Sequence, residues 1–277
     1  MKVAIQGEMG SNSHMATVAM LGNLKELQII ACTVSAEVMG KVVAGDVDGA
    51  VLPIENSLHG SVAEHYDLLL EQPVRIAGES LLRIRHNVIV SPGVKLNEIR
   101  RVMSHPVALS QCRRFLAAHP EFEVVPFYDT AGSVKHVMAE GLKDVAGLAP
   151  ELAASWYGAE VLIPGVEDHA ENFTRFHLVL RDGVDSQAFG TVGEPNKMSV
   201  AFAIEHRPGT LVAALERLAR AGVDLTKIES RPVPGSPWEY VFYVDARFDG
   251  PKTAEAALAS LREHCRMVKV LGQYRAA

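Results

Sequence analysis

Cysteine is scarce in this sequence of 277 residues, and its three copies, Cys32, Cys112 and Cys265, lie far apart. An odd number of cysteines without a CxxC pair excludes a disulfide framework and a zinc ribbon. No apolar run approaches the ~18 residues that a membrane-spanning helix needs. The first residues, MKVAIQGEMG, lack the long apolar stretch of a signal peptide and are typical of a strand. These absences predict a cytoplasmic protein without a membrane partner.

Blocks of like charge are also absent, and 27 basic against 33 acidic residues give a net charge of −6. This balance argues against nucleic acid or an anionic membrane surface as the main partner. With 48% hydrophobic and 22% charged residues, the composition is that of an ordinary globular protein. The length suggests roughly two domains.

Strand and helix patterns alternate over the first 180 residues, which predicts an α/β fold with mostly parallel sheets. The expected strands are 2–6, 28–32, 49–53, 75–91, 101–104, 123–127, 145–148 and 175–180. The expected helices are 13–21, capped by Ser13, and 35–44, 64–70, 108–118, 132–140 and 151–157.

Residues 183–196 break the alternation with three glycines and a proline, and we interpret them as a linker. The remaining residues, 197–277, predict the order βαββαβ of a ferredoxin-like unit, with turn residues at 234–237 and a strand at 238–246. The sequence therefore predicts a first domain over 1–182, with chain crossings between its two lobes near 78–91 and 155–165, and a second domain after the linker.

Polar residues follow two of the expected strands, where the ligand crevice of an α/β sheet lies, and a third polar group leads into another strand. Glu55, Asn56 and Ser57 form the first group, although on composition alone a turn with a helix-capping Glu55 is the stronger interpretation. In the second group, Ser104 and His105 follow a strand, with His105 at the entry of a helix that has Pro106 at its first turn and carries Gln111, and a capping role is an equal alternative.

The third group lies in NFTRF (172–176), where the Thr174 hydroxyl and the Arg175 guanidinium are adjacent, a combination that suits a carboxylate. A structural salt bridge is the alternative for Arg175. The tight loop over 7–13 precedes a helix N-terminus, where backbone N–H groups can bind an anion. P-loop, HExxH and dinucleotide-binding motifs are absent.

Three motifs, PIENSLHGSV (53–62), SHPVALSQC (104–112) and NFTRF (172–176), together with the βαββαβ tail, resemble the bacterial prephenate dehydratases. The tail resembles their ACT regulatory domain, with RPGTL (207–211) and ESRP (229–232) similar to the phenylalanine-binding motifs. The resemblance implies a two-lobed catalytic domain, like that of periplasmic binding proteins, over 1–182 and an ACT domain over 197–277. Plant arogenate dehydratases share this architecture.

The resemblance also implies the roles of individual residues. The implied catalytic residues are Thr174, Glu55, Asn56, Ser57, His105 and Gln111, with Thr174 orienting the departing hydroxyl group. The implied substrate-binding residues are Arg175, Phe176, Gly10, Ser13, Ser104 and Thr130. The implied phenylalanine-binding residues are Gly209, Thr210, Leu211, Val212, Glu229, Ser230, Arg231 and Pro232.

The expected reaction converts prephenate to phenylpyruvate, needs no metal or other cofactor, and is inhibited by phenylalanine. Arogenate is the alternative substrate, and a non-catalytic amino-acid sensor is the alternative class of protein. The resemblance implies a homodimer or homotetramer. Three positions depart from the family pattern, with Asn12 in place of an aromatic residue, Val107 in place of glutamine and Thr210 in place of alanine.

Overall fold

The computed structural model describes residues 1–190, 193–233 and 239–277. The described chain forms two compact units. Unit 1 comprises Met1–Val62 and Ser80–Phe176, and unit 2 comprises Ala63–Glu79 and His177–Ala277. The domain limits inferred from the sequence stay a prediction. No helix among the described residues is long and apolar enough to cross a membrane.

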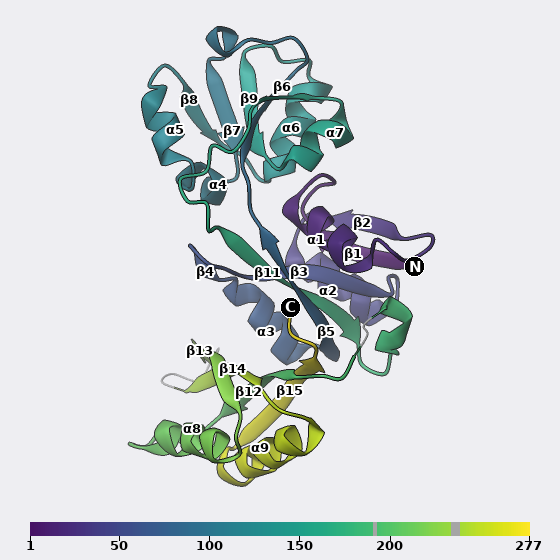
Figure 1. Cartoon of the computed structure of the whole chain (residues 1–277), viewed down its shortest axis with the longest axis vertical. Helices are drawn as coiled ribbons and strands as arrows, with labels where there is room; N and C mark the ends of the chain where they lie inside the picture. Colours follow the sequence, from purple (N-terminus) through teal and green to yellow (C-terminus); the bar gives the residue numbers. More distant parts are fainter. Residues whose placement is uncertain (191–192, 234–238) are drawn as a thin grey trace. The chain divides into compact units, whose positions relative to one another are not determined.

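The first sheet has the strand order β2-β1-β3-β11-β5, with β4 paired to β3 (Figure 1). Its strands are β1 (Lys2–Gln6), β2 (Gln28–Cys32), β3 (Gly49–Asn56), β4 (Gly60–Ser61), β5 (Val74–Arg83) and β11 (Phe173–Arg181). β1 runs parallel to both β2 and β3. Val3, Ala4 and Ile5 are all fully buried, as expected for a parallel strand covered on both faces. Helices α1 (Asn12–Leu21) and α2 (Ser35–Ala44) pack against β1 and β3.

The second sheet has the order β10-β6-β9-β7-β8. Its strands are β6 (Asn87–Val90), β7 (Arg101–Ser104), β8 (Glu123–Pro126), β9 (Val145–Ala149) and β10 (Glu160–Ile163). The helical segments of this region are η1 (Leu96–Glu98), α4 (Pro106–Ser110), α5 (Arg113–Ala118), α6 (Thr130–Ala139) and α7 (Glu151–Tyr157). Val88 and Val90 belong to the core beneath α4 and α5, whereas Ile89 belongs to the core beneath α6 and α7. This alternation places apolar cores on both faces of the sheet.

Unit 2 contains a four-stranded antiparallel sheet of order β13-β14-β12-β15. Its elements are α3 (Ala63–Glu71), η2 (Ser186–Phe189), β12 (Lys197–Ala203), α8 (Thr210–Arg220), β13 (Asp224–Pro232), β14 (Tyr240–Arg247), α9 (Pro251–His264) and β15 (Met267–Tyr274). Buried side chains of α8 and α9 pack in one hydrophobic core with Met198, Val200 and Phe202, which lie at every second position of β12. The chain order from β12 to β15 is the predicted βαββαβ, so the fold class is confirmed.

Several element limits differ from those expected. α1 begins at Asn12 because Ser11, not Ser13, accepts a hydrogen bond from the backbone N–H of a first-turn residue, His14. β3 continues to Asn56, three residues beyond the expected end, because β4 pairs with its last two residues. Strand β10 was not expected, and it adds an antiparallel edge to β6.

Two long predicted segments are divided in the structure. Residues 75–91 form β5 and β6, separated by three residues, and the first of these strands begins at Val74. The helix expected over 108–118 is two helices, with Gln111 at the end of α4 and Cys112 at the start of α5. The turn residues 234–237 and Trp238 lie outside the described residues. The expected linker contains η2.

Candidate functional site

A cavity of about 790 Å³ lies in unit 1. Its wall draws residues from the ends of β1, β3 and β11 and from the first turns of α1, α4 and α6. Of the site residues predicted from the sequence, the cavity is lined by Ser13, Asn56, His105, Gln111, Thr130, Thr174 and Phe176. The predicted residues Gly10, Glu55, Ser57, Ser104 and Arg175 are not part of its wall. The structure therefore brings together about half of the predicted set.

Strand β11 separates Thr174 from Arg175. Thr174 and Phe176 line the cavity, and alternation along a strand turns the intervening side chain to the opposite face. Arg175 is buried there, with its Nη2 2.9 Å from Oε2 of Glu55. This is the salt-bridge alternative considered for Arg175, and neither residue of the pair lines the cavity.

Three side-chain amides form a closed ring of hydrogen bonds beside Thr174. Asn56 Nδ2 donates to Asn172 Oδ1 at 2.8 Å, and Asn172 Nδ2 donates to Gln111 Oε1 at 2.9 Å. Gln111 Nε2 completes the ring with a longer hydrogen bond of 3.4 Å to Asn56 Oδ1. All three amides donate in the same sense around the ring, and the ring joins residues from β3, α4 and the segment before β11.

The backbone fixes the direction of this ring. The N–H groups of Leu58 and His59 both donate to Asn56 Oδ1 at 3.0 Å, and the carbonyl of Phe173 accepts from Asn56 Nδ2 at 3.1 Å. A flipped Asn56 amide would set donors against donors, so its orientation is determined. Asn56 Nδ2 consequently donates to Thr174 Oγ1 at 3.0 Å. Because the described contacts use Thr174 Oγ1 as an acceptor, its own proton remains available to a ligand in the cavity.

His86 supports the ring from inside the protein and was missed by the sequence reasoning. It lines the cavity wall, is 2% exposed, and its Nε2 donates to Gln111 Oε1 at 2.8 Å. Burial lowers the pKa of His86, although the hydrogen bond to Gln111 acts in the opposite sense. The His86 imidazole is therefore neutral at neutral pH. It lies within the single strand expected over 75–91, and 24 residues separate it from Gln111 in the chain, with no motif that links the two.

His59 is a second residue that the sequence reasoning did not single out. Gln111 Nε2 donates to His59 Nδ1 at 3.0 Å, which leaves the His59 proton on Nε2, 3.0 Å from Ser110 Oγ. His59 therefore ties the loop after β3 to the end of α4 across the cavity wall.

His105 caps α4, as one of the two sequence interpretations predicted. Its Nδ1 accepts a hydrogen bond of 3.3 Å from the backbone N–H of Val107. Burial lowers the pKa of His105, with the Asp129 carboxylate acting in the opposite sense. At neutral pH the imidazole is therefore neutral, which makes it a poor source of a proton.

The opposite part of the wall is charged. Lys135 Nζ lies 2.9 Å from Oε2 of Glu8, and the Tyr128 hydroxyl donates to Oε1 of Glu8 at 2.8 Å. Burial raises the pKa of Glu8, but the hydrogen bonds from Lys135 and Tyr128 outweigh this and hold the pKa below its ordinary value. Burial raises the pKa of the neighbouring Asp129, whose Oδ1 caps α6 by accepting from Gly132 N–H.

The chain is similar in sequence to proteins of known function. A family model described as prephenate dehydratase matches residues 3–183. The "Arogenate dehydratase/prephenate dehydratase 2, chloroplastic" of Arabidopsis thaliana is 37% identical and covers 99% of this chain and 72% of the relative. The bifunctional chorismate mutase/prephenate dehydratase of Escherichia coli K12 is 33% identical over 99% of this chain and 70% of the relative. The chain belongs to the prephenate dehydratase family.

Two solved structures of similar fold carry different descriptions. Prephenate dehydratase from Arthrobacter aurescens in complex with L-Phe is 30% identical, with a TM-score of 0.86 over 99% of this chain and 90% of that chain. A structure described as GqqA, a novel type of quorum quenching acylase, is 31% identical, with a TM-score of 0.87 over 100% of this chain and 98% of that chain. The family model, the curated relatives and the prephenate dehydratase structure together show that the chain is an enzyme of a lyase family.

Two more of the predicted site residues, Ser57 and Ser104, form hydrogen bonds to the backbone. Ser57 Oγ donates to the Glu171 carbonyl at 3.1 Å and accepts from Phe173 N–H at 3.0 Å. Ser104 Oγ donates to the Leu148 carbonyl at 2.6 Å, which links β7 to β9. These two hydroxyls hold the strands that carry the site and do not face the cavity.

Gly10 also acts through the backbone. It has a φ of +85°, and a Cβ at this position would lie 2.8 Å from the Cα of Ala153. A side chain would therefore separate the loop before α1 from α7. Gly10 allows this close approach, while Ser13 from the same loop and helix reaches the cavity.

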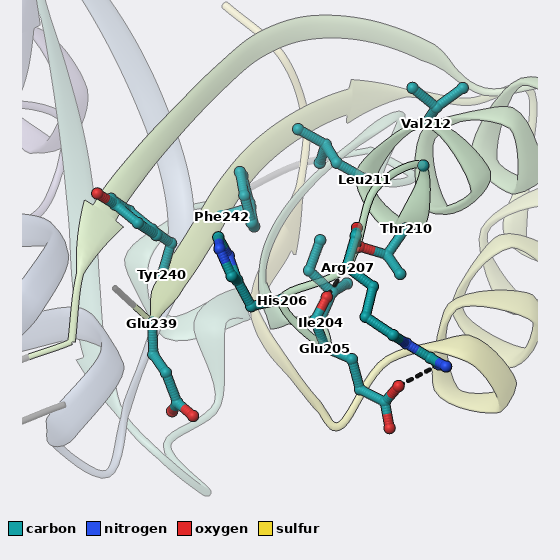
Figure 2. A pocket seen from close by; sticks show the side chains of 11 residues that line it. Ile204, Glu205, His206, Arg207, Thr210, Leu211, Val212, Glu239, Tyr240 and Phe242 are labelled. Atoms are coloured by element: carbon teal, nitrogen blue, oxygen red, sulfur yellow. Dashed lines mark hydrogen bonds and ion pairs between the residues drawn. The ribbon is translucent and has the colours of Figure 1, made fainter. Parts of the chain in front are cut away.

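The predicted effector residues divide into two groups within unit 2. Gly209, Thr210, Leu211 and Val212 line a second cavity of about 230 Å³ at the start of α8, which Figure 2 shows beside Tyr240 and Phe242 of β14. The residues from Glu229 to Pro232 lie on β13 and are not part of its wall. Arg231 instead binds Asp67 of α3, with 2.6 Å between Nη2 and Oδ2.

Proposed function

We propose that this enzyme removes water and CO₂ from prephenate to form phenylpyruvate, with arogenate as the alternative substrate on the same scaffold. The observation that carries the proposal is the Thr174 hydroxyl, which accepts a hydrogen bond from Asn56 and has its proton available in the cavity. The reaction needs a donor to the departing hydroxyl group, and this threonine is such a donor. The curated relatives named prephenate and arogenate dehydratases support the substrate class.

The chemistry requires little more than this donor. When the ring carboxylate leaves as CO₂, its electron pair enters the ring and the C4 hydroxyl departs, so the ring becomes aromatic. The departing group leaves as hydroxide and takes up one proton to become water. Thr174 would stabilise the charge that develops on that oxygen, and the Asn56 amide would hold the threonine in the required orientation. Phe176, which lines the cavity, is buried and presents an apolar face.

The first turns of two helices reach the cavity, and that of α1 would help to hold a substrate carboxylate, whereas the N-terminus of α6 already carries the Asp129 carboxylate. Asn12 and Ser13 lie in the first turn of α1, and Thr130 lies in the first turn of α6. Backbone N–H groups at such positions favour a negative charge. These residues, together with Gln111 as a neutral donor, form the binding part of the proposal.

The test is turnover of each substrate by the purified protein, followed as formation of phenylpyruvate from prephenate and of phenylalanine from arogenate. We expect catalysis with at least one of them, and their ratio of kcat/KM gives the preference. A protein that converts neither substrate would contradict the proposal. The sequence prediction of a cytoplasmic location belongs to the same proposal.

An acylase is the second candidate, because one structural relative is described as such and because Ser110 lies beside His59. The hydrogen bond between His59 and Ser110 runs in the wrong direction for nucleophilic catalysis. Gln111 donates to His59 Nδ1, so the His59 proton lies on Nε2, facing the Ser110 Oγ that it would have to deprotonate. Ser110 in turn donates to the Val107 carbonyl at 2.7 Å. The geometry therefore favours the dehydratase.

Regulation by phenylalanine is the second part of the proposal. The cavity at the start of α8 offers the N-terminus of a helix for a carboxylate and apolar side chains such as Leu211 and Phe242 for a ring. A relative from Arthrobacter aurescens was solved in complex with L-Phe, which supports this ligand. In the family resemblance, residues 229–232 of a second copy complete the site, so we propose a homodimer or homotetramer.

Phenylalanine is expected to bind the intact protein and to inhibit turnover. Gly209 has a φ of +83°, so Gly209→Leu both strains this turn and fills the cavity, and it should weaken binding at least tenfold, about 1.4 kcal/mol. The exposed Val212 lines the same cavity, so Val212→Arg offers a second variant with less risk to folding. Calorimetry on the three proteins is the measurement. Equal phenylalanine affinity in all three would place the effector elsewhere.

A further inference from the structure

The cavity offers very few cations to a substrate that carries two carboxylates. Among the described residues that line it, Lys135 is the one lysine or arginine. Arg175, which the family resemblance assigns to a carboxylate, lies on the opposite face of β11 against Glu55. An anionic ligand in this cavity therefore meets one lysine or arginine on the described wall, Lys135.

Lys135 is placed to accept a second anionic partner. Its ammonium has three N–H groups, of which Glu8 Oε2 takes one at 2.9 Å. Half of the Lys135 side chain is exposed. Glu8 is held independently of Lys135, because the Tyr128 hydroxyl donates to its other oxygen. A carboxylate can thus bind Lys135 without displacing Glu8.

We propose that Lys135 binds the side-chain carboxylate of the substrate, which is the carboxylate that the product retains. The proposal rests on the dehydratase function and extends it to the orientation of the substrate. Loss of CO₂ moves negative charge out of the ring carboxylate, so a cation on that group would stabilise the ground state more than the transition state. The retained carboxylate keeps its charge throughout, so binding it to Lys135 costs nothing in the chemical step.

Glu8 then weakens binding of the substrate carboxylate, so Lys135 and Glu8 have opposite effects on substrate affinity. The Lys135 ammonium attracts the carboxylate, whereas the Glu8 carboxylate next to it repels the ligand. A purely structural ion pair makes a different prediction, because removing either partner would then harm the site in the same direction. The signs of the two substitutions therefore separate a binding role from a structural one.

The experiment compares wild type with Lys135→Met and Glu8→Gln, using the substrate that the enzyme turns over. Lys135→Met should raise KM by about 5- to 20-fold, the scale of one charge-assisted hydrogen bond partly screened by solvent, and change kcat less than about twofold. Glu8→Gln should lower KM by about threefold. Lys143→Met, an exposed lysine outside the cavity wall, is the matched control and should leave KM unchanged.

Binding of phenylpyruvate, measured by calorimetry, identifies which carboxylate is involved. Phenylpyruvate has the side-chain carboxylate and lacks the ring carboxylate, so Lys135→Met should weaken its binding by the same factor as it raises KM. Unchanged binding of phenylpyruvate, an unchanged KM in Lys135→Met, or KM shifts of the same sign in both variants would overturn the proposal. Because this binding needs no turnover, it tests Lys135 even if failure of catalysis contradicts the dehydratase function.

Discussion

Thr174→Ala is expected to lower kcat by about 10²–10³, the usual cost of removing one preorganised donor to a developing negative charge. The hydroxyl group interacts with an oxygen that gains charge only as the C–O bond breaks, so KM should change little. Thr174→Val, which keeps the shape of the side chain, should give the same result. Thr174→Ser keeps the hydroxyl and should retain substantial activity. Steady-state kinetics on the three variants is the measurement.

Ser91→Ala is the matched control for the Thr174 variants. Ser91 is also buried in unit 1, where its Oγ donates to the Leu142 carbonyl at 2.7 Å, outside the cavity wall. Its removal should lower stability without lowering kcat. A kcat near the wild-type value in Thr174→Ala or Thr174→Val would contradict the role of the hydroxyl, because both variants lack the proposed donor.

Asn56→Asp is expected to lower kcat about as much as Thr174→Ala does, although it replaces one atom. The aspartate oxygen in the place of Nδ2 is an acceptor, so the Thr174 hydroxyl would donate to it and turn its proton away from the substrate. The same oxygen would face Asn172 Oδ1 and the Phe173 carbonyl, both of which are acceptors. Kinetics of the variant, with its melting temperature as a measure of folding, is the test.

A double-mutant comparison shows whether Asn56 acts through Thr174. If it does, Asn56→Asp should cost almost nothing further in a Thr174→Ala background, because the group that it orients is already absent. Additive losses in kcat would mean that Asn56 contributes independently, and the amide ring would then be a structural feature without a positioning role.

The sequence was sufficient for the order of most elements, although β4 and β10 were not expected, and its motifs singled out Thr174. Alternating strand and helix patterns predict the α/β region, and the pattern after residue 197 predicts the βαββαβ order, because both depend on local periodicity. Thr174, Asn56 and Gln111 came from motifs, and all three line one cavity. The motifs could not give the ring that joins them, since its direction depends on backbone N–H groups at Leu58 and His59.

The opposite orientations of Thr174 and Arg175 could have been predicted from the sequence, whereas the long-range contacts of Lys135 and His86 could not. Neighbouring residues in a strand face opposite ways, so Thr174 and Arg175 could have been assigned to opposite faces once the strand was extended to Phe173. The contacts of Lys135 and His86 could not be predicted from the sequence. Lys135 contacts Glu8, 127 positions away in the chain, and His86 contacts Gln111, 25 positions away. Such pairs depend on the packing of separate elements, and a single sequence carries no pattern that reveals them.

The central claim is that water and CO₂ leave one substrate molecule together in the cavity that contains Thr174. The most direct measurement uses prephenate or arogenate with a labelled ring carboxylate and counts labelled CO₂ against aromatic product. Wild type should release one CO₂ for each aromatic product, and Thr174→Val should lower both rates by the same factor of about 10²–10³. Aromatic product formed at the wild-type rate by Thr174→Val, or no labelled CO₂ from wild type with either substrate, would contradict the account.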